Sequence, residues 1–309
     1  MTRAVLAILL ALSASLAALP VQAARNSPNG GSALDCPLPP GWSAVAQQQA
    51  RFVVFGELHG TEQAPRFVGQ VACALALSGK RVLVAVEHGA NLAPAWQAAW
   101  DLPPGRFDAA LAAEGWAGRN DGIGSKAYFD MLVRLHLLKA RGHSVAITPF
   151  AGFTDKAQFD RFSGIPGQGG YEAAMAENIA AAAKAGDYDV VLVLVGNLHA
   201  RKTSVVRGAV SFEPMAMQLA RQAKVVTLDM RYGPGTSWIC QLKPGVAPGP
   251  GKRIGPDDMA CGNLPTAGYP GFRGAPRIAL EAGATAEAPA PYDGVFWLGP
   301  VTGSAPILR

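Results

Sequence analysis

The sequence predicts an α/β protein with a mainly parallel sheet, helices on both faces and a small helical cap. Three apolar, β-branched runs carry this prediction. Each is followed at once by acid, amide or imidazole side chains: Phe52 to Phe55 by Glu57 and His59, Val82 to Val86 by Glu87 and His88, and Val190 to Val195 by Asn197 and His199. In an open parallel sheet, ligands bind beyond the carboxyl ends of the strands. Three of the five histidines are expected at such ends.

The individual elements follow from apolar periodicity and from glycine and proline breaks. Strands are expected over 52–55, 81–86, 144–148, 190–195 and 225–229, and helices over 65–77, 126–140, 171–184 and 214–222. Pro149 is expected to close the third strand. This alternation of strands and helices indicates parallel strands joined by right-handed crossovers.

Two segments depart from the alternation. Between 91 and 125 the pattern loosens into two short helical pieces, around Trp96 and Leu111, which are expected to form the cap over the sheet edge. Residues 233–291 are rich in glycine and proline and poor in periodic apolar residues, so they are expected as a surface excursion. Residues 294–298 are expected to return as an edge strand.

The N-terminal residues 1–23 have the pattern of a cleavable signal peptide. Arg3 supplies the positive charge, Ala4 to Leu19 the apolar stretch, and Val21-Gln22-Ala23 the small-residue cleavage pattern. The predicted order is then an extended arm over 24–50, the core with its cap over 51–232, and a disulfide-tied tail over 233–309. This organisation predicts a periplasmic or secreted protein without a membrane anchor in the mature chain.

Cysteine usage agrees with export, because an even count in an oxidising compartment indicates disulfides. The four cysteines, Cys36, Cys73, Cys240 and Cys261, allow three pairings. We favour Cys240–Cys261, which would tie the tail, with Cys36–Cys73 pinning the N-terminal arm. Alternatively, Cys73 is a small buried hydrophobe on a helix.

Charge composition argues against a nucleic-acid partner. The formal net charge is +5, but only 16% of the residues are charged and lysine and arginine do not cluster. Nucleic-acid-binding proteins usually concentrate such residues on one face. A small molecule is therefore the expected partner.

Glu57 and His59 are the first candidate catalytic pair. With one residue between them, their side chains leave an extended backbone on the same face. A carboxylate beside an imidazole holds its tautomer and raises its basicity, as a general base requires. The same pair is also suited to metal ligation. The alternative is a turn-capping glutamate beside a surface histidine.

Glu87 and His199 complete the candidate site. A lone carboxylate after an apolar strand is costly unless it is paired or faces a cleft, although Glu87 is alternatively a helix N-terminal charge. His199 is expected as a second imidazole facing the first. If the cleft holds a divalent metal or iron, the expected ligands are His59, Glu87 and His199.

Six further residues are expected to contact substrate: His88, Trp116, Arg119, Asp121, Asn197 and Arg201. Arg201, with Lys202, would meet an anionic substrate or a developing oxyanion, or would simply be a solvated loop cation. His88 is expected to point away from Glu87, and a structural turn equally explains the residues near 116–121. HExxH, GxSxG, Walker and GxGxxG motifs are absent, which leaves water- or metal-based chemistry as the simplest.

At these residues the chain resembles the superfamily that joins erythromycin-esterase-like hydrolases, haem-binding ChaN-type iron-uptake proteins and TIKI/TraB metalloproteases. The resemblance is carried by Gly56-Glu57-x-His59-Gly60-Thr61, by Glu87 and by Gly196-x-x-His199. The segment Tyr171-Glu172-x-x-Met175-Ala176-x-Asn178-Ile179 is similar to the helix before the last motif, although the family often has Arg-Asp where Tyr171-Glu172 stand.

The resemblance to the esterases implies an exported hydrolase of an ester or amide, with or without a metal. His59 would activate water, Glu57 would orient His59, and Glu87 and His199 would position substrate or stabilise the transition state. The resemblance to ChaN implies instead a haem- or iron-binding uptake protein without catalysis, with a homodimer expected on ligand binding. The chain lacks the lipidated cysteine and second histidine of the ChaN pattern, and its cap is shorter than that of the esterases. A third hypothesis is an extracellular binding module, because fold does not fix function.

Overall fold

The computed structural model describes residues 35–116, 118–247, 249, 254–281 and 289–307. The predicted signal peptide and most of the predicted arm lie outside these residues. Within them, no helix is long and apolar enough to cross a membrane.

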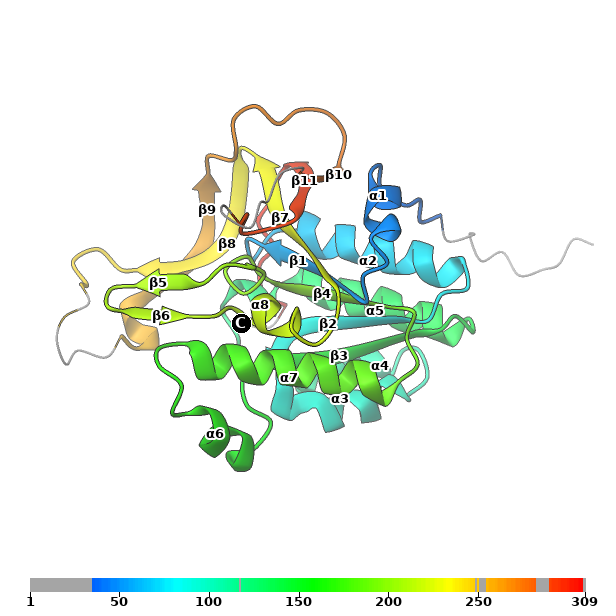
Figure 1. The fold of residues 1–309 in the computed structure, drawn as a ribbon, viewed down its shortest axis with the longest axis horizontal. Coiled ribbons are helices and arrows are strands. Elements are labelled where there is room, and N and C mark those ends of the chain that lie inside the picture. The colour runs from blue at the N-terminus through cyan, green and yellow to red at the C-terminus, as the bar shows by residue number, and fades with distance from the viewer. Residues whose placement is uncertain (1–34, 117, 248, 250–253, 282–288, 308–309) are drawn as a thin grey trace, which may run out of the picture. The chain divides into compact units, whose positions relative to one another are not determined.

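A seven-stranded sheet forms the centre of the described chain (Figure 1). Its strand order is β10-β11-β7-β1-β4-β2-β3. The strands are β1 (Phe52–Glu57), β2 (Val82–Gly89), β3 (Val145–Ala151), β4 (Val190–Gly196), β7 (Val225–Gly233), β10 (Arg277–Leu280) and β11 (Gly294–Pro300). Every neighbouring pair is parallel except β10 and β11. The predicted fold class is confirmed.

Helices cover both faces of this sheet. One face shares its core with α2 (Gln63–Leu77), α3 (Ala93–Trp100), α4 (Phe107–Ala113) and α5 (Lys126–Ala140). The other face packs against α7 (Gly169–Ala185) and α8 (Met215–Leu219). Two more helices are peripheral, α1 (Trp42–Gln47) and α6 (Lys156–Phe162).

Strand β4 shows why the sequence specifies this arrangement. All seven of its residues are buried. Val190, Leu192 and Leu194 belong to one core, whereas Val191, Val193 and Val195 belong to the other. Continuous apolar strands of this kind are typical of parallel sheets with both faces covered.

The predicted strands and helices recur with small shifts at their ends, and four expectations need correction. Strand β3 does not end at Pro149, which pairs with Val86 inside the strand. Pro149 has no N–H to donate, and this is tolerated because β3 is an edge strand with a neighbour on one side only. Strand β11 is not an edge strand, since β10 lies outside it.

The other two corrections concern the late part of the chain. The region 233–291 contains regular structure: β8 (Gly235–Leu242) pairs with β9 (Met259–Thr266), and β10 follows. A second hairpin, β5 (Val205–Arg207) with β6 (Val210–Phe212), was also not predicted. The hairpins contain few periodic apolar residues, so the sequence pattern did not reveal them.

The segment predicted as a cap contains α3 and α4, as expected. Trp96, Trp100, Phe107 and Leu111 are almost entirely buried and belong to the main core. These helices therefore extend the layer that also contains α5.

Both favoured disulfides are confirmed. Cys36 is bonded to Cys73 on α2. Cys240 is bonded to Cys261, its direct cross-strand partner in the β8–β9 hairpin. The first bond ties the residues before α1 to the main helical layer, and the second closes the hairpin.

We expect the Cys36→Ser/Cys73→Ser double variant to lose about 3 kcal/mol of unfolding free energy, because the bond closes a loop with a sequence separation of 37 residues. Urea unfolding followed by circular dichroism measures this loss. A Cys240→Ser/Cys261→Ser variant, which keeps the first bond, serves as the comparison. Equal stability of wild type and Cys36→Ser/Cys73→Ser would show that the bond does not restrain the unfolded chain.

Candidate functional site

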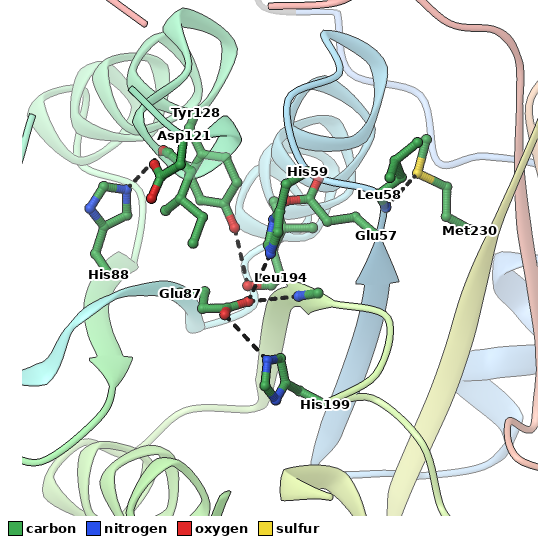
Figure 2. Close-up of polar contacts among 12 residues, drawn as sticks. Glu57, Leu58, His59, Glu87, His88, Asp121, Tyr128, Leu194, His199 and Met230 are labelled. Carbon is green, nitrogen blue, oxygen red and sulfur yellow. Dashed lines mark hydrogen bonds and ion pairs between the residues drawn. The ribbon is translucent and has the colours of Figure 1, made fainter. Parts of the chain in front are cut away.

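The candidate site lies at the carboxyl ends of three adjacent strands. Strand β4 lies between β1 and β2, and Glu57 at the end of β1 is in register with Gly196 at the end of β4. Glu87 comes from β2, and His199 from the turn that follows β4. The four residues predicted as catalytic therefore lie together (Figure 2).

Glu57 and His59 form a close pair. His59 Nδ1 lies 2.8 Å from Glu57 Oε1, the glutamate is buried, and 27% of the His59 side chain is exposed. The turn at His59 depends on Gly60, which has φ +74° and no room for a Cβ against the carbonyl of Trp238. The Gly60 carbonyl accepts hydrogen bonds from the Trp238 and Ser304 backbone N–H groups, at 2.9 and 2.8 Å. The hairpin and the C-terminal segment thus fix the backbone beside His59.

Glu87 lies between the two imidazoles. Its Oε2 accepts a 2.7 Å hydrogen bond from the Gly196 N–H and lies 3.3 Å from His59 Nε2. Its Oε1 lies 3.5 Å from His199 Nε2. A side chain at position 196 would place its Cβ 2.9 Å from His59 Nε2, so glycine is required for this approach.

The second imidazole has a carboxylate of its own. His199 Nδ1 lies 2.7 Å from Glu172 Oε1, and Glu172 is fully buried on α7. The Met215 N–H donates to Glu172 Oε2 at 2.8 Å, and Gln168 donates to Oε1 at 2.9 Å. Glu172 was not among the predicted site residues, although its helix segment belonged to the motif that carried the resemblance.

The result is a continuous series, Glu57–His59–Glu87–His199–Glu172, in which carboxylates and imidazoles alternate. We call this the Glu/His series. Burial opposes the charge on Glu87, but His59, His199 and the Gly196 N–H outweigh burial and lower the Glu87 pKa to about 2. Glu87 is therefore ionised across the physiological range.

The imidazoles respond to the carboxylates on either side of them. Burial alone would lower the pKa of His59, but Glu87 and Glu57 hold this pKa well above its ordinary value. Glu172 and Glu87 likewise overcome burial and raise the pKa of His199. Burial raises the pKa of Glu57, with His59 acting in the opposite direction.

Tyr128 closes the site from the face of the sheet that carries α5. Its hydroxyl donates to the Leu194 carbonyl at 3.2 Å, and the side chain is fully buried. Burial and the nearby carboxylates raise the pKa of Tyr128 well above its ordinary value. The phenol therefore stays neutral beside the acidic groups.

An open cleft of about 780 Å³ reaches Glu87 and His199. Its walls are formed by residues that precede or begin α7 and by the β5–β6 hairpin: Gly167, Gln168, Tyr171, Arg207, Val210 and Phe212. The cleft connects the Glu/His series with solvent.

The structure places two predicted substrate-binding residues away from this cleft. His88 and Trp116 are fully buried, and their rings stack with centroids 4.3 Å apart. His88 points to the opposite face from Glu87, as its position in the strand predicted.

Arg119 and Asp121 pair with each other at 2.7 Å and shape the loop beside His59. Asp121 accepts a 3.0 Å hydrogen bond from the Gly124 N–H. A Cβ at Gly122 in this loop would lie 2.8 Å from His59 Cβ, so the loop packs closely on the histidine. These two residues are therefore placed to support His59.

Asn197 and Arg201 follow β4 and are near a second polar group, Asp229 in the middle of β7. The Asn197 carbonyl accepts a 2.8 Å hydrogen bond from the Tyr292 hydroxyl. Asp229 on β7 is buried and pairs with Arg231 at 2.6 Å. Burial raises the pKa of Asp229 to about 6, and the charge of Arg201 acts against this rise.

The carboxylates and imidazoles of the site are potential ligands for a metal ion or haem. In the part of the chain that the structure describes, no group of three or more His, Cys, Asp and Glu residues is arranged to hold a metal ion. Both nitrogens of His59 and both nitrogens of His199 face carboxylate oxygens. This arrangement does not fit an axial haem ligand, and metal binding by His59, Glu87 and His199 stays a prediction.

Similarity to known proteins is found in the fold and not in the sequence. No protein-family model and no curated protein matches the sequence. A variant of the erythromycin esterase EreC in its open conformation matches with a TM-score of 0.57 and 12% identity, over 87% of this chain and 94% of that one. A protein from Bacillus cereus matches with a TM-score of 0.54 and 10% identity, over 85% of this chain and 92% of that one.

These matches establish the fold that the resemblance implied. The haem-binding ChaN of Campylobacter jejuni also matches, with 13% identity over 62% of this chain and 86% of that one. Its TM-score of 0.38 gives no support to haem binding here. The matches therefore concern the fold and not the chemistry of this chain.

We expect Glu172→Gln to lower the pKa of His199, because the carboxylate that raises this pKa is removed. Titration of the His199 ring protons by NMR measures the change. Glu177→Gln, on the same helix but paired with Arg161, is the matched control and should leave the titration unchanged. An unaltered His199 pKa in Glu172→Gln would contradict the assigned contact.

Proposed function

We propose that this protein is a hydrolase that uses activated water to cleave an ester or amide. The observation that carries the proposal is the Glu/His series, which an open cleft reaches at Glu87 and His199. It places a carboxylate-held imidazole beside an ionised carboxylate and a second, carboxylate-held imidazole. Such an arrangement serves general base catalysis and stabilises a developing negative charge.

The first step follows from the contacts of His59. Glu57 accepts from Nδ1 and so holds the tautomer in which Nε2 is free to take a proton. Once Nε2 has lost its proton, Nε2 and Glu87 Oε2 are two acceptors facing each other at 3.3 Å. A water molecule that donates one hydrogen to each satisfies both. His59 Nε2 then takes one proton while the water oxygen attacks the carbonyl carbon.

The second imidazole supplies positive charge to the same step. His199 is protonated more readily than a free histidine, because Glu172 and Glu87 raise its pKa. Its Nε2 is directed toward Glu87 at the cleft, where it can donate to the oxyanion or to the leaving group. When the tetrahedral intermediate collapses, the proton held by His59 passes to the leaving group and the carboxylic acid product departs.

We also propose that the protein acts outside the cytoplasm. The two disulfides support this location, because such bonds persist in oxidising compartments. The signal-peptide pattern of residues 1–23 supports it independently.

His59→Ala is expected to reduce kcat/KM by roughly 10²- to 10⁴-fold, the usual contribution of a general base. Turnover of a panel of nitrophenyl esters and anilides measures the loss, and circular dichroism checks the fold. His143→Ala, in a turn at the opposite end of the sheet, is the matched control. Full activity of His59→Ala would exclude His59 as the base.

The pH dependence of kcat/KM provides a second test. The base must be unprotonated, and its pKa is raised above 6.5, so kcat/KM should rise with pH through a limb on the alkaline side of that value. Glu87→Gln removes the largest contribution that raises the pKa of His59. The limb of its residual activity should therefore move to lower pH. A limb at the same pH in both proteins would assign the titration to another group.

A further inference from the structure

We propose that the cleft selects substrates with an apolar acyl or aromatic body and a distal anionic group, and that Arg207 is the residue that recognises this group. The inference rests on the proposed hydrolase and specifies its substrate class. It is carried by the β5–β6 hairpin, which lines the cleft together with the residues that precede and begin α7. The hairpin lies beside α8 (Figure 1).

The hairpin and α7 give the cleft its apolar lining. Val210 and Phe212 of β6 and Tyr171 of α7 all line it. The hairpin packs closely on the segment before α7, because a Cβ at Gly167 would lie 2.6 Å from Val210 Cγ1. In the segment before α7, the apolar side chain of Ile165 is a further exposed group, at 41%. An apolar ligand body would therefore find apolar surface in the cleft and next to it.

Arg207 is a cleft-lining cation with no ion pair to any described residue. Its Nη1 donates to Gln168 Oε1 at 3.3 Å, and its guanidinium lies 6.0 Å from the Phe212 ring centroid. By contrast, Arg161 and Arg221 on the surface are paired with Glu177 and Glu213. The guanidinium of Arg207 is thus available to a carboxylate or phosphate group of a ligand.

Among the charged side chains that line the cleft, Arg207 is the one without an ion pair to a described residue. Glu87 is matched by the two imidazoles and the Gly196 N–H. Gln168 connects the rim to the base, because its amide nitrogen donates to Glu172 while its oxygen accepts from Arg207. The N-terminal end of the 17-residue helix α7 also borders the cleft and adds a favourable potential for an anion.

Direct binding tests this inference without relying on turnover. The probes are phenylbutyrate and its neutral amide, and the proteins are wild type, Arg207→Gln and Arg207→Lys, studied by isothermal titration calorimetry. Wild type should bind the carboxylate more tightly than the amide. Arg207→Gln should weaken binding of the carboxylate about fivefold or more and leave the amide unchanged. Arg207→Lys should recover part of the preference, and added salt should reduce it.

Arg221→Gln is the matched control, because it removes a surface arginine outside the cleft and should bind both probes as wild type does. Absence of binding to wild type, equal binding of the two probes, or an equal loss for both in Arg207→Gln would each overturn the assignment. The esterase activity is measured separately on neutral substrates. Hydrolysis by His59→Ala tests the proposed hydrolase, and the preference for the carboxylate over the amide tests this inference. A His59→Ala protein that loses hydrolysis but keeps this preference would show that the two are independent.

Discussion

The ionised state of Glu87 is the constraint on which the rest of the site depends. A carboxylate that is 6% exposed at the end of an apolar strand is unfavourable unless its charge is compensated. Two imidazoles and the Gly196 N–H supply that compensation, and they come from segments that are distant in the sequence. The positions of the turn after β1, of the end of β4 and of the turn that follows β4 are therefore coupled through one side chain.

The order of the strands makes this coupling feasible. Strands β1 and β2 are the first two strands in the sequence, and β4 lies between them in the sheet. Gly196 at the end of β4 has no side chain to separate His59 from Glu87, so the two flanking strands can share a site across the middle one. Glu57 and Glu87 lie on opposite faces of the sheet, and His59 reaches over the end of β4 to join them. An added methyl group at position 196 would break this connection.

Much of this arrangement could be predicted from the sequence, because strands buried in a parallel sheet have continuous apolar sequences. The polar residues directly after those runs, Glu57, His59, Glu87 and His199, form the centre of the site. Glu172 was missed as a site residue because it lies on a helix, where one carboxylate among many alanines has no strand-end signal. Arg207 was missed because each strand of its hairpin has only three residues, too few to show a two-residue period. Trp116 was expected at the cleft and is in the core instead, since indole size alone does not distinguish a pocket from a packed interior.

The two carboxylate–imidazole pairs are similar in composition but differ in how well their charges are satisfied. Both oxygens of Glu172 have hydrogen-bond partners besides His199, whereas Glu57 Oε2 is buried without a partner. The His199 side chain is 12% exposed and that of His59 is 27% exposed. A fully satisfied ion pair favours one fixed protonation state, and an incompletely satisfied one costs less to neutralise. The more exposed imidazole, beside the less satisfied carboxylate, is therefore His59, which agrees with the proposed role of His59 as the group that exchanges a proton with water.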